Sequence, residues 1–147
     1  MIMYESLVRD GTELTEGKIL LSGTDDHRVL GTNRRLYYSA EPRTLSYRPS
    51  VDVFFKSVAG HWPRSGVAAL LTGMGRDGAE GLLQLRRLGW KTIAQDESTS
   101  VVWGMPRAAV ALGAADQVLP LPLIGQAIAS FFLVPNPSQA QARPTSF

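Results

Sequence analysis

Short apolar runs alternate with turn-forming residues along the chain, and this pattern predicts a succession of strands and helices. Residues 18–22 are typical of a short buried strand. Residues 28–31 and 35–39 predict two more strands, and the turn-forming Gly31 and Asn33 between them predict an antiparallel hairpin. The first part of the chain should therefore contribute mainly strands.

A helix and a βαβ unit follow this hairpin. Residues 51–59 repeat apolar positions at helical spacing, and Ser50 is a suitable N-cap because its hydroxyl can bond a free N–H group of the first turn. Residues 66–72 then predict a strand, residues 79–88 a helix and residues 91–95 a second strand. This order predicts parallel pairing of the two strands with a right-handed crossover.

The remaining predicted elements complete the fold and indicate its class. Pro106 suits the first turn of a helix, residues 117–119 predict an edge strand and residues 121–132 a last helix. The fold class is therefore α/β: a Rossmann-like, mostly parallel sheet with flanking helices and one antiparallel hairpin. We expect one domain over residues 1–133. Residues 134–147 hold three prolines and few apolar side chains, which predicts a disordered tail.

Composition narrows the function classes. The 147 residues are 44% hydrophobic and 19% charged, the range of a single globular domain. The absence of cysteine and the presence of only two histidines argue against a metal site, and we expect neither metal nor cofactor. The net charge of +2 comes with scattered arginines, which argues against nucleic-acid binding. No run reaches the ~20 consecutive apolar residues of a membrane helix, so we expect a cytoplasmic protein without membrane insertion.

The segment from Gly73 to Gly78 satisfies G-x-G-x-x-G between a predicted strand and a predicted helix. With Asp96 18 residues further on, it has the outline of a dinucleotide-binding βαβ unit. Asp77 argues against that hypothesis, because its carboxylate would lie beside the negatively charged phosphates of a dinucleotide. Two like charges ~4 Å apart repel by about 1 kcal/mol even in water. A carboxylate here would instead suit the acid of a Ser-His-Asp triad. A third interpretation is that Asp77 only caps its own helix.

Four segments together add a family resemblance. Residues 48–52, 71–79, 94–98 and 102–106, in this order, resemble the CheB-type protein-glutamate methylesterase domain, and the likeness extends from Gly17 to Phe132. The chain looks most similar to the branch associated with Wsp-type surface-sensing systems. The resemblance implies that Asp77 is the acid of the triad and that the backbone N–H of Met74 belongs to the oxyanion hole. It also implies hydrolysis of glutamyl methyl esters on the cytoplasmic helices of chemoreceptors, without metal or cofactor.

The sequence departs from the family in one respect. The family's nucleophile lies in a G-A-S-x-G-G segment and its base histidine in a Q-H segment, and neither segment occurs in these 147 residues. We therefore expect the carboxyl-terminal part of a methylesterase domain, with its amino-terminal part missing, that supplies the acid and the oxyanion turn and has negligible activity alone. Loss of inner strands would also favour self-association through an exposed sheet edge. The alternative is a non-catalytic module of the same fold that binds receptors or another partner.

Five other residues are candidates for contact with a substrate. His27 matches a family position at a strand end near the cleft, where we expect a structural or substrate-edge role. Arg48 and Ser50 precede a predicted helix and would meet an acidic or amide group of a receptor, although an ion pair and an N-cap are simpler roles for them. Ser98 lies in a loop at the carboxyl end of a strand, where ligands of open α/β sheets gather. Trp103 either lines the cleft or belongs to the core.

Overall fold

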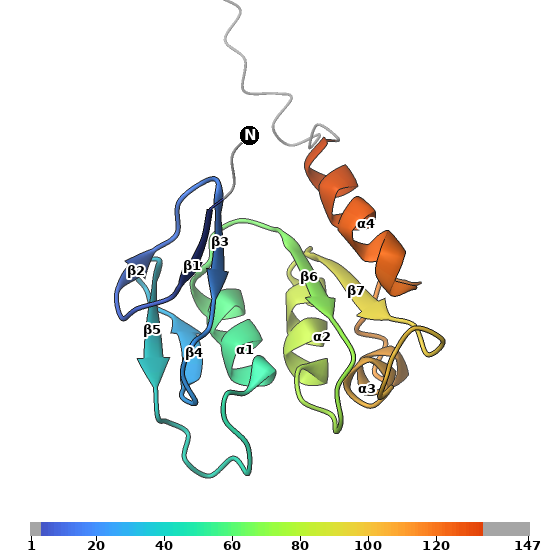
Figure 1. Cartoon of the computed structure of the whole chain (residues 1–147), viewed down its shortest axis with the longest axis horizontal. Coiled ribbons are helices and arrows are strands. Elements are labelled where there is room, and N and C mark those ends of the chain that lie inside the picture. The colour runs from blue at the N-terminus through green and yellow to red at the C-terminus, as the bar shows by residue number, and fades with distance from the viewer. Residues whose placement is uncertain (1–3, 134–147) are drawn as a thin grey trace, which may run out of the picture.

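The computed structural model describes residues 4–133, so the predicted tail at 134–147 lies outside the described residues (Figure 1). Most elements agree with those expected from the sequence. In chain order they are β1 (Tyr4–Leu7), β2 (Thr12–Glu13), β3 (Lys18–Leu21), β4 (His27–Leu30), β5 (Arg35–Ser39), α1 (Val51–His61), β6 (Val67–Leu70), α2 (Ala79–Arg87), β7 (Lys91–Gln95), α3 (Met105–Ala111), β8 (Gln117–Leu119) and α4 (Leu121–Leu133).

The strands form three short sheets. β4 and β5 make the predicted antiparallel hairpin, and β2 joins its β5 side. β6, β7 and β8 pair in parallel, which confirms the predicted βαβ unit and the edge position of β8. The sequence did not indicate β1, which pairs in parallel with β3. Within residues 4–133, β3 pairs only with β1 and β6 only with β7, so each keeps one unpaired edge, and their arrows point the same way in Figure 1.

Helix boundaries follow from local chemistry. The Ser50 hydroxyl accepts a hydrogen bond from the N–H of Val53 at 3.3 Å, which confirms Ser50 as the N-cap of α1. α2 starts after Gly78, whose φ of +89° is a conformation that favours glycine. Pro106 lies in the first turn of α3, where its missing N–H costs nothing.

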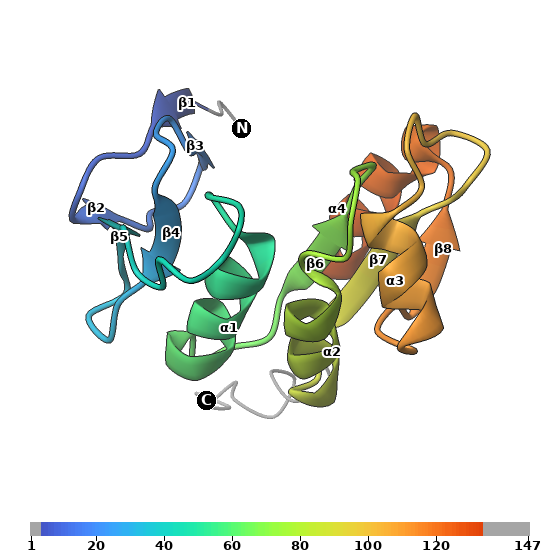
Figure 2. The same ribbon diagram turned by 90° about the horizontal axis from the view of Figure 1, so that it is seen from below.

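One apolar core connects the two groups of strands. Figure 2 shows α1 and α2 side by side, with α1 next to β4 and β5 and α2 next to β6. The two helices approach closely because Gly81 of α2 has no side chain: a Cβ there would lie 2.6 Å from the Cβ of Phe55. Leu30, Phe55, Leu82 and Leu85 belong to the shared core. This packing brings the amino-terminal end of α1 against the turn that follows β6.

Asp116 gives the fold a measurable dependence on pH. Burial opposes ionisation of its carboxyl group, but hydrogen bonds from Thr92 and the charge of Arg86 together lower its pKa. A lowered pKa stabilises the folded chain above the unfolded-state pKa of about 4, and this contribution disappears as pH falls through the folded-state pKa. We expect Asp116→Asn to lower the free energy of unfolding by about 1 kcal/mol at pH 7 and by nothing once the folded-state carboxyl is protonated.

Urea unfolding of both proteins from pH 7 down to the acid limit of folding checks this expectation. Glu16→Gln is the matched control, because Glu16 is exposed and its carboxylate makes no hydrogen bond to any residue in the described part of the chain. A stability difference between wild type and Asp116→Asn that is independent of pH would contradict the assignment.

Candidate active-site turn

The turn after β6 is held in place by a second loop. The N–H of Gly73 donates to the carbonyl of Val102 at 3.0 Å, and the carbonyl of Gly73 accepts from Gly104 at 3.1 Å and from Met105 at 2.8 Å. Gly75 adopts a φ of +93°, which a side chain would disfavour. The backbone of residues 71–78 therefore has a defined shape, set by main-chain contacts with residues 102–105.

Asp77 is buried at the end of this turn, against the start of α1. One carboxylate oxygen, Oδ1, accepts from the hydroxyl of Ser50 at 2.8 Å and from the N–H of Asp52 at 3.0 Å. Oδ2 accepts from the N–H of Val51 at 2.6 Å. Asp77 therefore bonds the amino-terminal end of α1. The interpretation that Asp77 caps its own helix is wrong, because α2 has no side-chain cap.

The same geometry suits an acid that orients a histidine. Free N–H groups at the start of a helix are hydrogen-bond donors that a carboxylate can accept from. A carboxylate has about four acceptor positions, and the described residues fill three at Asp77, which leaves one on Oδ2 for an imidazole N–H. The pKa of the nearby Tyr47 is raised, mainly by burial and then by the negative charges of Asp77, Asp52 and Glu80.

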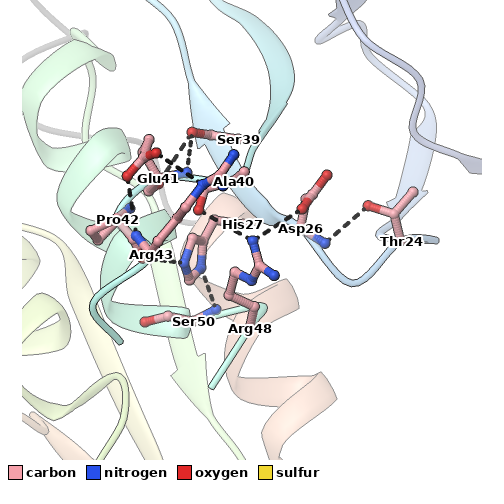
Figure 3. Close-up of polar contacts among 10 residues, drawn as sticks. All are labelled: Thr24, Asp26, His27, Ser39, Ala40, Glu41, Pro42, Arg43, Arg48 and Ser50. Atoms are coloured by element: carbon pink, nitrogen blue, oxygen red, sulfur yellow. Dashed lines mark hydrogen bonds and ion pairs between the residues drawn. The ribbon is translucent and has the colours of Figure 1, made fainter. Parts of the chain in front are cut away.

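His27 lies next to this group and is fully buried (Figure 3). Its Nδ1 accepts from the N–H of Ser50 at 3.0 Å, so the ring proton is assigned to Nε2, which lies 3.2 Å from the carbonyl of Pro42. Both ring nitrogens are therefore occupied by main-chain groups. In this arrangement His27 fixes the chain that enters α1 and has no nitrogen left for general-base catalysis.

Arg48 is exposed and lies near Asp26 and Ala40 (Figure 3). Its Nη1 donates to the carbonyl of Ala40 at 3.3 Å and lies 3.6 Å from the carboxylate of Asp26, an exposed pair of the kind that contributes about 0–1 kcal/mol. Arg48, Arg43 and Tyr47 line a cavity of about 400 Å³. Arg48 is exposed at this cavity, and its contact with a substrate stays a prediction. Ser50 is buried and bonds Asp77 and the first turn of α1.

Met74, Ser98 and Trp103 lie on loops at the carboxyl ends of β6 and β7. Met74 is 84% exposed, and its N–H makes no hydrogen bond to the residues that the structure describes, as an oxyanion donor requires. A β-bridge between Gly73 and Trp103 brings the two loops together. Trp103 is half-buried and donates from Nε1 to the carbonyl of Gln95 at 3.1 Å. Ser98 is exposed and bonds Asp96.

Asp96 is occupied by its own loop. Hydrogen bonds from Thr99 and Ser98 lower the pKa of its carboxyl group. A ribose-binding aspartate needs a free carboxylate, so these bonds weaken the dinucleotide hypothesis.

Gln95 is a positioning residue that the sequence analysis missed. It is 1% exposed, its Oε1 accepts from the N–H of Thr72 at 2.8 Å, and its Nε2 donates to the carbonyl of Thr99 at 2.8 Å. It therefore ties the turn after β6 to the loop after β7. The available signal was an amide directly after the apolar pair Ile93 and Ala94 of a predicted strand, because a buried amide requires partners.

Two properties of residues 4–133 bear on other functions. They contain no group of three or more histidine, cysteine, aspartate or glutamate side chains that would hold a metal ion. None of their helices is long and apolar enough to cross a membrane.

Comparisons with known proteins identify relatives of this chain. A protein-glutamate methylesterase/protein-glutamine glutaminase of Pseudomonas aeruginosa is 53% identical over 126 residues, which are 86% of this chain and 38% of the relative. A Bordetella avium protein of the same name is 51% identical over 132 residues, or 89% of this chain and 39% of the relative. The chain thus spans less than two thirds of these curated relatives.

A solved structure and a family model extend the match. The catalytic domain of the Thermotoga maritima CheB methylesterase superposes with a TM-score of 0.77 at 31% identity, covering 84% of this chain and 67% of that one. This likeness confirms the α/β fold class. The family model for CheB methylesterase matches residues 5–128, and the chain therefore belongs to the CheB methylesterase family.

Proposed function

We propose that this chain supplies the acid and an oxyanion donor to a hydrolase that acts on glutamyl side chains of chemoreceptors. The observation that carries the proposal is the position of Asp77, a buried carboxylate with three donors and one open acceptor site, on the same turn as the exposed Met74, whose N–H makes no hydrogen bond to the described residues. The relatives are named for both methylesterase and glutaminase activity. Both reactions attack a glutamyl carbonyl carbon, so one oxyanion site serves both.

In the proposed mechanism a serine attacks the glutamyl carbonyl and a histidine accepts the serine proton. Asp77 orients that histidine and stabilises its charged form, while the N–H of Met74 donates to the oxyanion. Methanol leaves from an ester, or ammonia from an amide, and water then releases the enzyme from the acyl intermediate. The serine and the histidine belong to the G-A-S-x-G-G and Q-H segments of the family, which these 147 residues do not contain.

The unpaired edges of β3 and β6 suggest where a further strand binds. Leu21 in β3 is 47% exposed and Leu71, just after β6, is 42% exposed. An unpaired edge with apolar neighbours is a template for strand addition. We propose that these edges receive polypeptide, either the segment that carries the nucleophile or, in its absence, a second copy of the chain.

One pair of proteins tests the proposal. The first is this chain alone, and the second is a fusion in which the nucleophile- and histidine-bearing segment of the Pseudomonas aeruginosa relative precedes Met1. We expect methanol release from a methylated receptor fragment by the fusion only. Sedimentation velocity should show self-association of the chain alone and less of it in the fusion. Efficient ester hydrolysis by the chain alone, or none by a folded fusion, would refute the proposal.

A further inference from the structure

A second cavity lies next to the amino-terminal end of α1. It has a volume of about 220 Å³ and lies between β3, β4, β5 and α1. Its walls are mainly apolar, with Val8, Leu20, Leu36 and Phe54 among them, and its polar groups include Ser22 and Arg28. The cavity is therefore a small hydrophobic site with one cationic side chain in its wall.

Arg28 is the unusual residue of this cavity. Arg28 is only 5% exposed. Its guanidinium carbon lies over the ring of Tyr38, 3.2 Å from the ring centroid. Its Nε donates to the hydroxyl of Ser22 at 3.4 Å, a long hydrogen bond. Its Nη1 and Nη2 are buried and have no acceptor among residues 4–133. Burial lowers the pKa of the group, although Tyr38 and Asp10 oppose this shift.

Packing alone does not account for this arrangement. A buried cation without acceptors destabilises a fold, and an apolar side chain of similar size usually serves better at such a position. Each Nη carries two N–H groups, so four donors of Arg28 have no acceptor among residues 4–133. Residues that lower stability without structural compensation are typical of binding sites.

We propose that this cavity binds a carboxylate that carries an apolar body, with Arg28 as its bidentate partner. The planar fork of a guanidinium matches the two oxygens of a carboxylate. Tyr38 covers one face of the guanidinium, so the ligand meets its edge, and the apolar walls receive the hydrocarbon part. Phosphate or sulfate would leave those walls unmatched. Both Nη atoms are shielded from solvent in this structure, so a carboxylate in the cavity reaches them only if the guanidinium rotates its edge towards the cavity when the ligand binds.

Two sources carry this chemistry, a free carboxylic acid and an acidic side chain of a polypeptide, and two matched probe pairs separate them. The first pair is 4-phenylbutyrate and its uncharged amide. The second is acetyl-Leu-Glu-Leu-amide and its glutamine counterpart. Titration calorimetry and thermal unfolding of the full chain are the measurements. We expect the acid of at least one pair to bind and to raise the melting temperature, with at least about tenfold weaker binding of the matching amide.

Arg28→Met and Arg28→Lys complete the test. We expect Arg28→Met to lose binding and, without ligand, to melt at a higher temperature than wild type, because it removes an unpartnered charge. Arg28→Lys keeps the charge without the fork and should bind at least several-fold more weakly. A response to 4-phenylbutyrate identifies a free acid as the source, and a response to the glutamyl peptide alone identifies a polypeptide. The proposal fails if neither acid binds, if the amides bind equally well, or if Arg28→Met retains binding.

Discussion

Replacing Asp77 by asparagine in the fusion protein is expected to lower kcat/KM for a glutamyl methyl ester by about 10⁴-fold. This is the loss seen when the acid of a serine-protease triad becomes an amide, and it corresponds to about 5.5 kcal/mol of transition-state stabilisation. Asparagine keeps the shape of the side chain but cannot stabilise an imidazolium ion. Because the change affects the transition state, kcat should fall and KM should change little.

The same substitution also alters the contacts with α1, so stability has to be measured with activity. Both oxygens of Asp77 accept hydrogen bonds, whereas the amide nitrogen of asparagine can only donate. One side of the asparagine amide would therefore lose its bond, either that from the N–H of Val51 or those from the donors to Oδ1. We expect a loss of about 2–3 kcal/mol in the free energy of unfolding. Kinetics are therefore compared well below both melting temperatures. Glu80→Gln, an exposed change three residues away, is the control and should stay within about twofold of the parent. An Asp77→Asn fusion with more than a tenth of the parent activity would rule out the triad role.

Gly104→Ala is expected to lower the free energy of unfolding by about 2–3 kcal/mol, through overpacking against the active-site turn. A Cβ at this position would lie 2.8 Å from the carbonyl oxygen of Gly73 and 2.9 Å from the nitrogen of Gly75. Both are main-chain atoms, so the turn itself has to move. The φ of Gly104 is −99°, which alanine adopts readily, and the effect is therefore steric.

Gly60→Ala is the matched control for this variant. Gly60 lies within α1, and a Cβ there would meet nothing within 4 Å. Alanine at this position should stabilise the helix by about 0.5–1 kcal/mol. Urea unfolding of both variants measures the contrast. Equal stability of Gly104→Ala and wild type would show that residues 71–78 adapt to the side chain and have no fixed shape.

The sequence predicted the elements whose signals are local. β5 and β7 were predicted with their observed boundaries, because apolar runs end there at turn-forming residues. Ser50 was recognised as an N-cap because a serine hydroxyl directly before an apolar helical pattern can bond a free N–H group of the first turn. β1 and β2 were missed, since they are short and one of the two residues of β2 is exposed, so no periodic apolar pattern marks them. The division into three sheets depends on strand partners, which local patterns do not specify.

Contacts between distant segments were harder to predict. Asp77 was expected at a helix end, but the helix that receives it begins 26 residues earlier in the chain, at Val51. The orientation of His27 towards the chain that enters α1 depends on the same long-range packing. Arg28 was not singled out, because an arginine in a strand is normally a surface residue and only tertiary structure shows that this one is buried.

Asp77 joins the two halves of the fold, and this has an evolutionary consequence. Because its carboxylate bonds the first residues of α1, a mutation that removes it would harm folding in any chain of this architecture, active or inactive. Selection for a folded protein alone would therefore preserve this aspartate after catalysis had been lost. The presence of Asp77 in a related sequence therefore does not by itself distinguish an active chain from an inactive one. That distinction also requires the serine and histidine that the open acceptor position of Asp77 would serve.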